Sequence, residues 1–257
     1  MKLRVLGCSG GVALQQYTTS MLVDEDVLID VGTGAATLEL DSMAKLRHVF
    51  ITHSHLDHIA SLPLIVDTIF AELMAEPIHI YALPATIKAL KDNIFNWVIW
   101  PDFSVLPTAE KPVMIYHEIE PGTVTELDGR RFEAIEVNHT VPTIAFRVDT
   151  GDGSKSFAFS GDTTTNDTLW PALNAHPDLN LLIVESAFSD EEFELAKLSK
   201  HYCPILLAND LRKLKHRPKV GVSHLKPNEE FTVLDQCHAL MKDWDLYPLN
   251  SDDVFEL

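Results

Sequence analysis

Short apolar runs recur along the whole chain and predict its strands. Each run is rich in β-branched and aromatic residues and is bounded by Gly, Asp or Pro, as buried β-strands commonly are. The runs lie at residues 3–7, 20–24, 27–32, 48–52, 78–83, 113–119, 132–139, 143–149, 156–162, 181–187 and 219–224.

Helical patterns fill the intervals between these runs. They cover residues 60–74, 85–98, 168–175, 190–198, 205–214 and 228–241. Pro204 and Pro227 lie where the first turn of a helix tolerates proline. Strands and helices are mixed over the whole length without a linker, a low-complexity tract or a clear repeat. We therefore predict a single α/β (α+β) domain over residues 1–257, built of strand-rich layers covered by helices.

The amino-acid composition and the first residues indicate where in the cell the protein is found. Apolar residues make up 46% of the 257 residues and charged residues 23%, which is ordinary for a globular protein. No window approaches the ~18–20 apolar residues of a membrane span, and the first residues, MKLRVLGCSGG, indicate a strand rather than a signal peptide. Cys8, Cys203 and Cys237 are too few for a disulfide framework. We expect a cytoplasmic protein with no membrane partner.

The charge argues against nucleic acid as a partner. The formal net charge is −18, and the 20 basic residues are scattered along the chain except for five between Arg212 and Lys219, which we interpret as a solvated helix end. Binding a long polyanion depends on clustered Lys and Arg. The chain is therefore predicted to act on a small molecule.

The segment THSHLDH, residues 52–58, brings His53, His55, Asp57 and His58 together. Imidazole and carboxylate are the ligands of zinc and related metals. His53 and His55 are two apart and can point the same way in an extended segment, while Asp57 and His58 follow at the turn into a helix. This spacing predicts a metal site.

Three further candidate ligands lie at the ends of predicted strands: His139, Asp162 and His224. Side chains at strand ends can converge on one edge of a sheet. Two metals that share a hydroxide need these extra ligands, and the two oxygens of Asp162 suit it for bridging. Such paired metals sit roughly 3.5–4 Å apart and act on phosphate esters by in-line displacement.

The motif THSHLDH, followed in order by VNH, SGD and VSH, resembles the metallo-β-lactamase superfamily. The longer stretch HSHLDHIASLPLI is similar to the signature of the class II cyclic nucleotide phosphodiesterases, as are residues 94–103, 185–204 and 222–227. The resemblance implies a four-layer αββα sandwich with two divalent metal ions. Zinc is the common metal, and manganese or iron accept similar ligands.

The resemblance also implies a role for each ligand. One metal would be held by His53, His55 and His139. The other would be held by Asp57, His58 and His224, and Asp162 would bridge the two. Asp30 matches an early aspartate that supports the ligand loop in the family, although alone it could equally be a turn residue before Gly32.

Two further residues are expected to take part in catalysis together with Asp57. Glu185 ends an apolar strand, where a charge needs a partner, and His201 lies just before a helix. By similarity, His201 would contact the phosphate or donate a proton to the leaving oxygen, with Glu185 fixing its tautomer. The alternative is a strand-end Glu and a helix-capping His.

The aromatic residues of the segment 94–103 have two possible interpretations. Trp97, Trp100 and Phe103 could stack on a nucleobase, which is worth ~1–3 kcal/mol per base, or could be plain core.

The function predicted from these motifs is metal-dependent hydrolysis of 3′,5′-cyclic nucleotides to 5′-nucleotides. The nucleophile would be a hydroxide shared by the two metals, with cAMP the first candidate substrate and a homodimer compatible with the superfamily. The alternatives are another phosphodiesterase, a tRNA 3′-processing nuclease, a lactonase or a non-catalytic binding protein. The tRNA nucleases of the superfamily carry a long arm before the bridging Asp, and here only residues 140–161 precede it.

Overall fold

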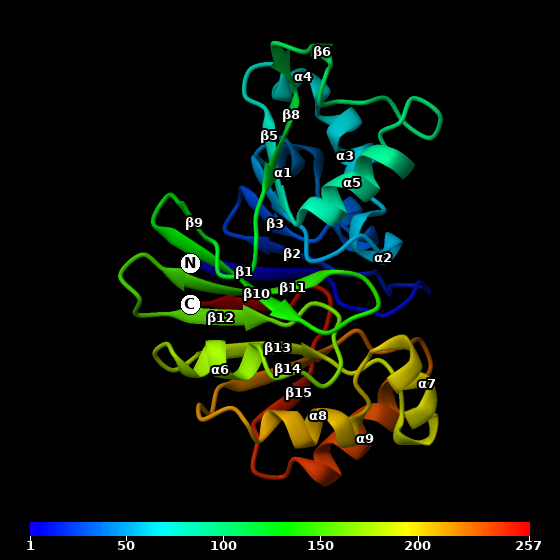
Figure 1. The fold of residues 1–257 in the computed structure, drawn as a ribbon, viewed down its shortest axis with the longest axis vertical. Helices are drawn as coiled ribbons and strands as arrows, with labels where there is room; N and C mark the ends of the chain where they lie inside the picture. Colours follow the sequence, from blue (N-terminus) through cyan, green and yellow to red (C-terminus); the bar gives the residue numbers. More distant parts are fainter.

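Two seven-stranded sheets form the centre of the computed structural model, which describes residues 1–257 (Figure 1). The first sheet has the spatial order β16 (Val254–Glu256), β1 (Lys2–Gly7), β2 (Ser20–Val23), β3 (Val27–Ile29), β4 (His48–Phe50), β5 (Ile78–Ala82) and β8 (Met114–Glu118). The second has the order β15 (Leu246–Pro248), β14 (Lys219–Ser223), β13 (Leu181–Glu185), β12 (Ser156–Phe159), β11 (Thr143–Thr150), β10 (Arg130–Val137) and β9 (Val124–Leu127). A small hairpin joins β6 (Pro107–Thr108) to β7 (Lys111–Pro112).

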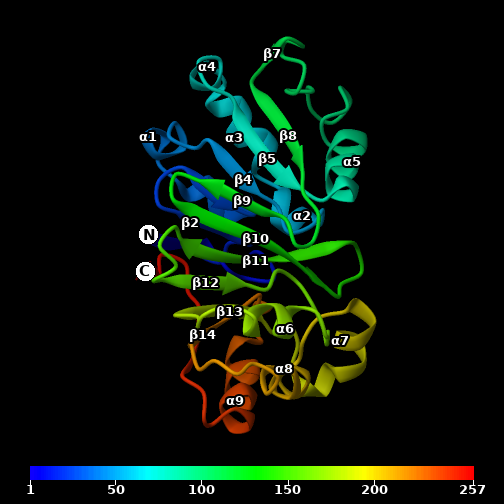
Figure 2. The same ribbon diagram turned by 60° about the vertical axis from the view of Figure 1, so that its left-hand side comes forward.

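Helices cover the outer face of each sheet, so the chain has four layers in the order αββα (Figures 1 and 2). The first sheet is covered by α1 (Leu40–Met43), α3 (Leu62–Thr68), α4 (Phe70–Leu73) and α5 (Pro84–Asn93). The second is covered by α6 (Leu169–Asn174), α8 (Pro204–Leu211) and α9 (Glu230–Leu240). At one edge of the sheets lie α2 (Leu56–Ile59) and α7 (Phe193–Ser199); two short 3-10 turns are η1 (Thr33–Thr37) and η2 (Asp190–Glu192). The predicted sandwich is confirmed.

Three hydrophobic cores hold the layers together: one between each sheet and its helices, and a third between the sheets. In the third core, the ring of Phe50 stacks on Phe132 with centroids 4.4 Å apart and meets Phe146 edge-on at 5.4 Å. Large buried aromatic side chains remove much apolar area from water, and their pairing adds directional packing. This core fixes the position of one sheet relative to the other.

The strand directions bring several strand ends to a single edge. In the second sheet, β12, β13 and β14 run parallel, and in the first sheet β3, β4, β5 and β8 run parallel. Parallel strands have their carboxyl ends at the same edge, where loops can carry functional side chains. Phe159 pairs with Ile183 and Glu185 pairs with Ser223, so the segments that follow these strands start side by side.

The structure corrects some predicted boundaries. The helix predicted at 60–74 is divided into α3 and α4 at Ile69, which has φ −105° and ψ 24°. The helix predicted at 85–98 ends at Asn93 because the Asn96 side chain accepts hydrogen bonds from the amides of Val98 and Ile99. Strands β9, β15 and β16, each short and at or near a sheet edge, were not predicted.

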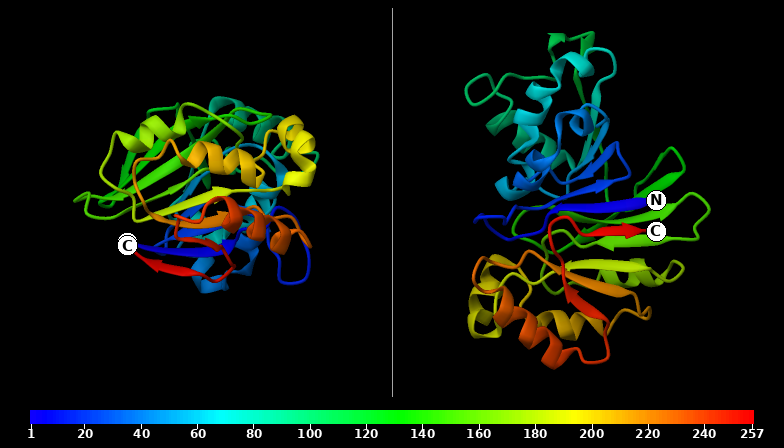
Figure 3. Two further views of the ribbon diagram at one scale, coloured as in Figure 1. Left: turned by 90° about the horizontal axis from the view of Figure 1, so that it is seen from below. Right: turned by 180° about the vertical axis from the view of Figure 1, so that it is seen from behind.

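The chain ends lie next to each other at the far edge of the sheets from α7 (Figure 3). The N-terminal ammonium group donates a hydrogen bond to the carbonyl oxygen of Leu257 at 2.9 Å. All three cysteines are buried and free. The helices include none with the length and apolar character needed to cross a lipid bilayer.

Candidate metal centre

Two groups of metal-ligating side chains meet at the edge where α2 and α7 lie, and they share Asp162. In each group, one ligand atom per residue lies within 4.8 Å of the others. The first group contains His53, His55, His139 and Asp162, and the second contains Asp57, His58, Asp162 and His224. These groups match the two ligand sets that the family resemblance implied.

Both sheets supply the site. His53 and His55 follow β4 of the first sheet, and Asp57 and His58 belong to α2. The remaining ligands, His139, Asp162 and His224, follow β10, β12 and β14 of the second sheet. Because the core between the sheets is rigid, ligands from both halves are held at fixed positions.

Asp162 lies between the two histidine groups. Its Oδ2 atom is 3.3 Å from His58 Nε2 and 3.7 Å from His53 Nε2, while its Oδ1 atom is 3.1 Å from His224 Nδ1. On the other side, Asp57 Oδ2 lies 3.8 Å from the Nε2 atoms of both His58 and His224. Because Asp162 lies between the two groups, its carboxylate can bind two ions at once.

Three buried imidazole nitrogens of the two ligand groups have no hydrogen-bond partner: His53 Nε2, His58 Nε2 and His224 Nδ1. A buried polar atom without a partner is costly, and native proteins rarely leave one unpaired. All three atoms face Asp162. Divalent cations at this point would satisfy them, and a mixed imidazole and carboxylate set is the chemistry that zinc prefers. The residues present therefore fit metal ions.

A second layer of hydrogen bonds orients two of these histidines. His58 Nδ1 lies 2.6 Å from Asp30 Oδ2, which also accepts a hydrogen bond from the Thr52 hydroxyl at 2.8 Å. The same hydroxyl lies 3.0 Å from His53 Nδ1. Both rings are thus fixed through Nδ1 and present Nε2 to the site, as ligating histidines usually do. Asp30 supports the ligand loop, and its left-handed φ of 58° marks a constrained backbone.

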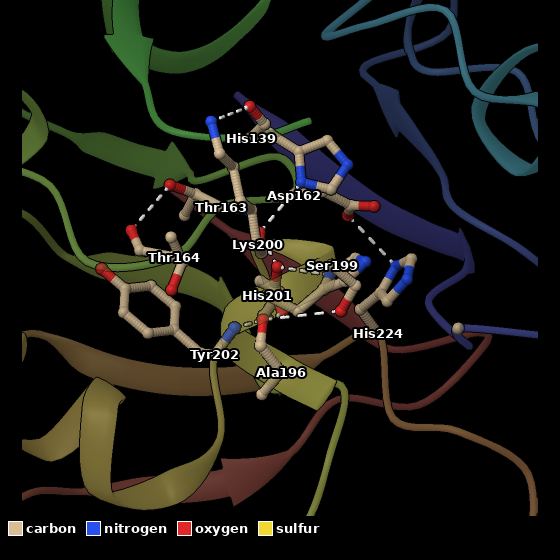
Figure 4. Close-up of polar contacts among 12 residues, drawn as sticks. His139, Asp162, Thr163, Thr164, Ala196, Ser199, Lys200, His201, Tyr202 and His224 are labelled. Carbon is tan, nitrogen blue, oxygen red and sulfur yellow. Dashed lines mark hydrogen bonds and ion pairs between the residues drawn. The ribbon is translucent and has the colours of Figure 1, made fainter. Parts of the chain in front are cut away.

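His139 is oriented by the backbone of α7's last turn. Its Nδ1 donates to the carbonyl oxygen of Lys200 at 2.9 Å, and Lys200 Nζ donates back to the carbonyl oxygen of His139 at 3.0 Å (Figure 4). Lys200 ends the helix in the left-handed region, with φ 55°. Sequence reasoning missed this contact because a backbone carbonyl carries no residue-type signal.

The ionisation of three ligand histidines and of Asp162 suits metal binding. Burial lowers the pKa of His53 far below its usual range, that of His139 to about 4 and that of His224 to about 3, so these rings are neutral and can act as ligands. Burial alone would raise the pKa of Asp162, but the neighbouring His224 and His58 hold that pKa well below its usual range. Asp162 is therefore a carboxylate. His58 differs from the other ligand histidines: burial would lower its pKa, but Asp162 and Asp30 outweigh it and raise that pKa well above its usual range, so His58 must give up a proton to bind a metal.

His201 and Glu185 form a pair beside the ligands, and with Asp162 they make a third close group. His201 Nδ1 lies 2.8 Å from Glu185 Oε1, which also accepts from the Thr163 amide; Glu185 Oε2 accepts from the Tyr202 amide. Burial would lower the pKa of His201, but the Glu185 carboxylate outweighs it and raises this pKa. The proposed pairing is present in the structure, and the His201 amide also donates to the carbonyl oxygen of Ala196 at the end of α7.

The glycine-rich segment 7–11 holds the His224 loop in place. His224 has a left-handed φ of 60°, and its amide donates to the carbonyl oxygen of Cys8 at 2.7 Å. Gly10 packs so closely that a Cβ there would lie 2.4 Å from the carbonyl oxygen of His224 and 2.8 Å from its Cδ2 atom. The sequence suggested only a tight turn here, so this role was missed.

We predict that Gly10→Ala weakens one metal site selectively. The added methyl group must displace His224, and disturbing the support of a ligand typically costs 10–100-fold in metal affinity. Elemental analysis after dialysis should therefore give close to one metal equivalent per chain instead of two. Gly11→Ala is the matched control, since its Cβ would meet only the Pro227 ring, at 3.0 Å. Equal metal content in both variants would contradict the prediction.

The aromatic segment divides between core and surface. Phe103 is buried in the core under the first sheet, and Trp100 packs against that core. Trp97 is 63% exposed in the turn that follows α5. Phe103 is thus a core residue and is not available to stack on a base.

Comparison with known proteins places this site in a family. Residues 26–241 match the family described as "Beta-lactamase superfamily domain". Ribonuclease Z of Pyrococcus abyssi is 29% identical over 136 residues, which is 52% of this chain and 41% of that protein. A probable 3′,5′-cyclic-nucleotide phosphodiesterase of Yersinia pestis is 27% identical over 209 residues, which is 71% of this chain and 60% of that protein. The chain thus spans between two and three fifths of the length of these curated relatives.

Solved structures show the same fold. Unliganded yeast PDE1 superposes with a TM-score of 0.84 at 16% identity, covering 100% of this chain and 99% of that one. The metallo-beta-lactamase fold protein YhfI from Bacillus subtilis superposes with a TM-score of 0.77 at 17% identity, covering 99% of this chain and 98% of that one. The short form of human tRNase Z superposes with a TM-score of 0.70 at 17% identity, covering 100% of this chain and 99% of that one. Members of this fold family bind divalent metal ions and act as hydrolases, and the two groups that share Asp162 are the candidate ligands here. The chain belongs to the metallo-β-lactamase superfamily.

Proposed function

We propose that the chain hydrolyses 3′,5′-cyclic nucleotides to 5′-nucleotides, with cAMP the first candidate. The observation that carries the proposal is the extent of the match. Relatives named as cyclic-nucleotide phosphodiesterases, from Yersinia pestis and Aliivibrio fischeri, each match 71% of this chain. The Ribonuclease Z of Pyrococcus abyssi matches 52%.

The connection before Asp162 supports a small substrate. Residues 140–161 contain only β11, a turn at residues 151–155 and β12. No arm projects from this hairpin to hold a folded RNA. The net charge of −18 also opposes binding to a polyanion.

Two divalent ions, with zinc the first candidate, would be held by the two groups that share Asp162. When bound, they would lower the pKa of water to about 7 and stabilise negative charge on phosphoryl oxygens. We assign His53, His55 and His139 to one ion and Asp57, His58 and His224 to the other. Two divalent ions would bring a charge of +4 against the −2 of Asp57 and Asp162, so the site would keep a net positive charge that attracts a phosphodiester anion.

The chain's own residues would then direct the reaction. A water oxygen would bond to phosphorus and lose a proton to solvent, the bond from phosphorus to the 3′-oxygen would break, and that oxygen would take a proton from a donor that solvent protonates again. We assign that donation to His201; the assignment is supported by Glu185, which engages its Nδ1 atom and leaves Nε2 free for a substrate. Residues 1–257 would act as one metallo-hydrolase domain, because both sheets supply ligands.

A second candidate function is RNA processing, which the match to Ribonuclease Z favours. We predict that metal-loaded protein hydrolyses cyclic nucleotides and shows no comparable cleavage of precursor tRNA. The reason is that residues 140–161 form no arm and that the chain has a net charge of −18. Product analysis should show cleavage at the 3′-side.

The measurement is a panel of 3′,5′-cyclic nucleotides, linear phosphodiesters, lactones and precursor tRNA, with metal-stripped protein as the control. Efficient tRNA cleavage without turnover of any cyclic nucleotide would reverse the ranking. Turnover of lactones alone would assign a different hydrolase to the same site.

A further inference from the structure

Two half-buried lysines lie beside the metal centre without an acidic partner: Lys200, which donates to the carbonyl oxygen of the ligand His139, and Lys226. Lys226, two residues after His224, donates from Nζ to the carbonyl oxygen of Gly10 at 2.7 Å. It takes part in none of the ion pairs of the structure, whereas Lys45 and Lys213 each bind a carboxylate at about 3 Å. In a chain with 38 acidic residues, a half-buried lysine without a carboxylate is a feature to be explained.

The ammonium group of Lys226 lies at the side of the site where His201 and His224 are found. Gly10, its hydrogen-bond partner, packs directly on His224. Lys226 Nζ is also 5.8 Å from the ring centroid of Phe188, and that ring meets His201 edge-on at 5.7 Å. The ring of His201 in turn stacks on His224 at 5.1 Å.

Phe188 offers an apolar surface at the same place. It lies three residues after Glu185, the last residue of β13, and one residue after the buried Ala187, yet its side chain is only partly buried. Lys226 and Phe188 thus form a cationic and aromatic pair next to His201.

We propose that this pair binds the nucleotide: Lys226 holds a phosphoryl oxygen and Phe188 packs against the nucleoside. The inference rests on the proposed function. An ammonium has three donors, and the carbonyl of Gly10 uses one, so donors remain for a phosphate. Aromatic rings bind bases by stacking without requiring a specific base.

The test is calorimetric titration of metal-loaded protein with inorganic phosphate and with 5′-AMP. Lys226→Gln should weaken the binding of both by about ten- to a hundredfold, the range for a lost charge-assisted hydrogen bond. Lys226→Arg should restore most of the affinity. Phe188→Leu should lower the affinity for 5′-AMP by about fivefold or more and leave the affinity for phosphate unchanged.

Lys155→Gln is the matched charge control, because Lys155 lies in the β11–β12 turn at the opposite end of the second sheet from Asp162. Metal content is measured for every variant. Unchanged phosphate binding in Lys226→Gln, or weaker binding caused by lost metal, would overturn the proposal and leave Lys226 as a brace for the Gly10 loop. Equal effects of Phe188→Leu on both ligands would remove Phe188 from the nucleoside site. These titrations need no turnover, so they remain decisive even if cyclic nucleotides are not hydrolysed.

Discussion

Asp162→Ala is expected to abolish activity and to release metal from both halves of the site. The side chain contributes to both ligand groups, with one oxygen near His224 and the other near His53 and His58. Its removal therefore weakens the binding of two ions at once and takes away a buried negative charge. We expect less than one metal equivalent per chain after dialysis. The specificity constant kcat/KM should fall by at least about a thousandfold, which corresponds to roughly 4 kcal/mol.

Single ligands provide the comparison. His139→Ala and Asp57→Ala each remove a ligand from one group only, so each should retain close to one equivalent. Circular dichroism and thermal unfolding check that every variant remains folded. Two equivalents retained by Asp162→Ala, or saturation of the unsubstituted protein at one, would contradict the shared carboxylate.

The layered fold was predictable because its strands are apolar and its helices amphipathic. The failures have identifiable physical causes. Strand β9, with the sequence VTEL, is an edge strand with alternating exposure and little apolar signal. Strand β16 is short and pairs with β1, at the opposite end of the sequence, so no local pattern marks it. In the segment after Asn93, apolar residues continue the helical period, but the Asn96 side chain captures two amides and stops the helix.

The site was predictable to a different degree at each level. Metal ligands must be particular residue types, so the spacing in residues 52–58 and the strand-end positions of His139, Asp162 and His224 pointed to them. The contacts that hold some of these ligands in place are made by backbone atoms, which every residue has. The carbonyl of Lys200 orients His139, and the backbone of Gly10 shapes the His224 loop. Such contacts depend on the folded path of the chain and have no signature in sequence.

The pairing of His201 with Glu185 shows where sequence and structure together lead to chemistry. Glu185 is fully buried at the end of β13, and it accepts hydrogen bonds from the His201 ring and from two amides. The His201 ring lies 4.9 Å from that of His139 and 5.1 Å from that of His224. Because Nδ1 is engaged by Glu185, the remaining nitrogen is the one that can meet a substrate. The raised pKa of His201 keeps a proton available for transfer.

We expect His201→Ala to lower kcat for a cyclic nucleotide by about 10²–10⁴-fold, the usual contribution of a positioned general acid, while two metal ions stay bound. Glu185→Gln should have a smaller effect, since an amide still accepts from the ring but carries no charge. The double variant should be little worse than His201→Ala, because the two residues act as one unit. Steady-state kinetics and elemental analysis on the same preparations measure these effects.

The leaving group separates a proton donor from a residue that only positions the phosphate. The 3′-oxygen of a ribose is a strong base and needs a proton as it departs, whereas p-nitrophenolate leaves as a stable anion. If His201 donates that proton, His201→Ala should slow hydrolysis of bis(p-nitrophenyl) phosphate far less than hydrolysis of a cyclic nucleotide. An equal loss on both substrates would make His201 a phosphate-binding residue. Loss of metal in His201→Ala would instead show that the third close group, Asp162 with Glu185 and His201, serves the metal centre directly.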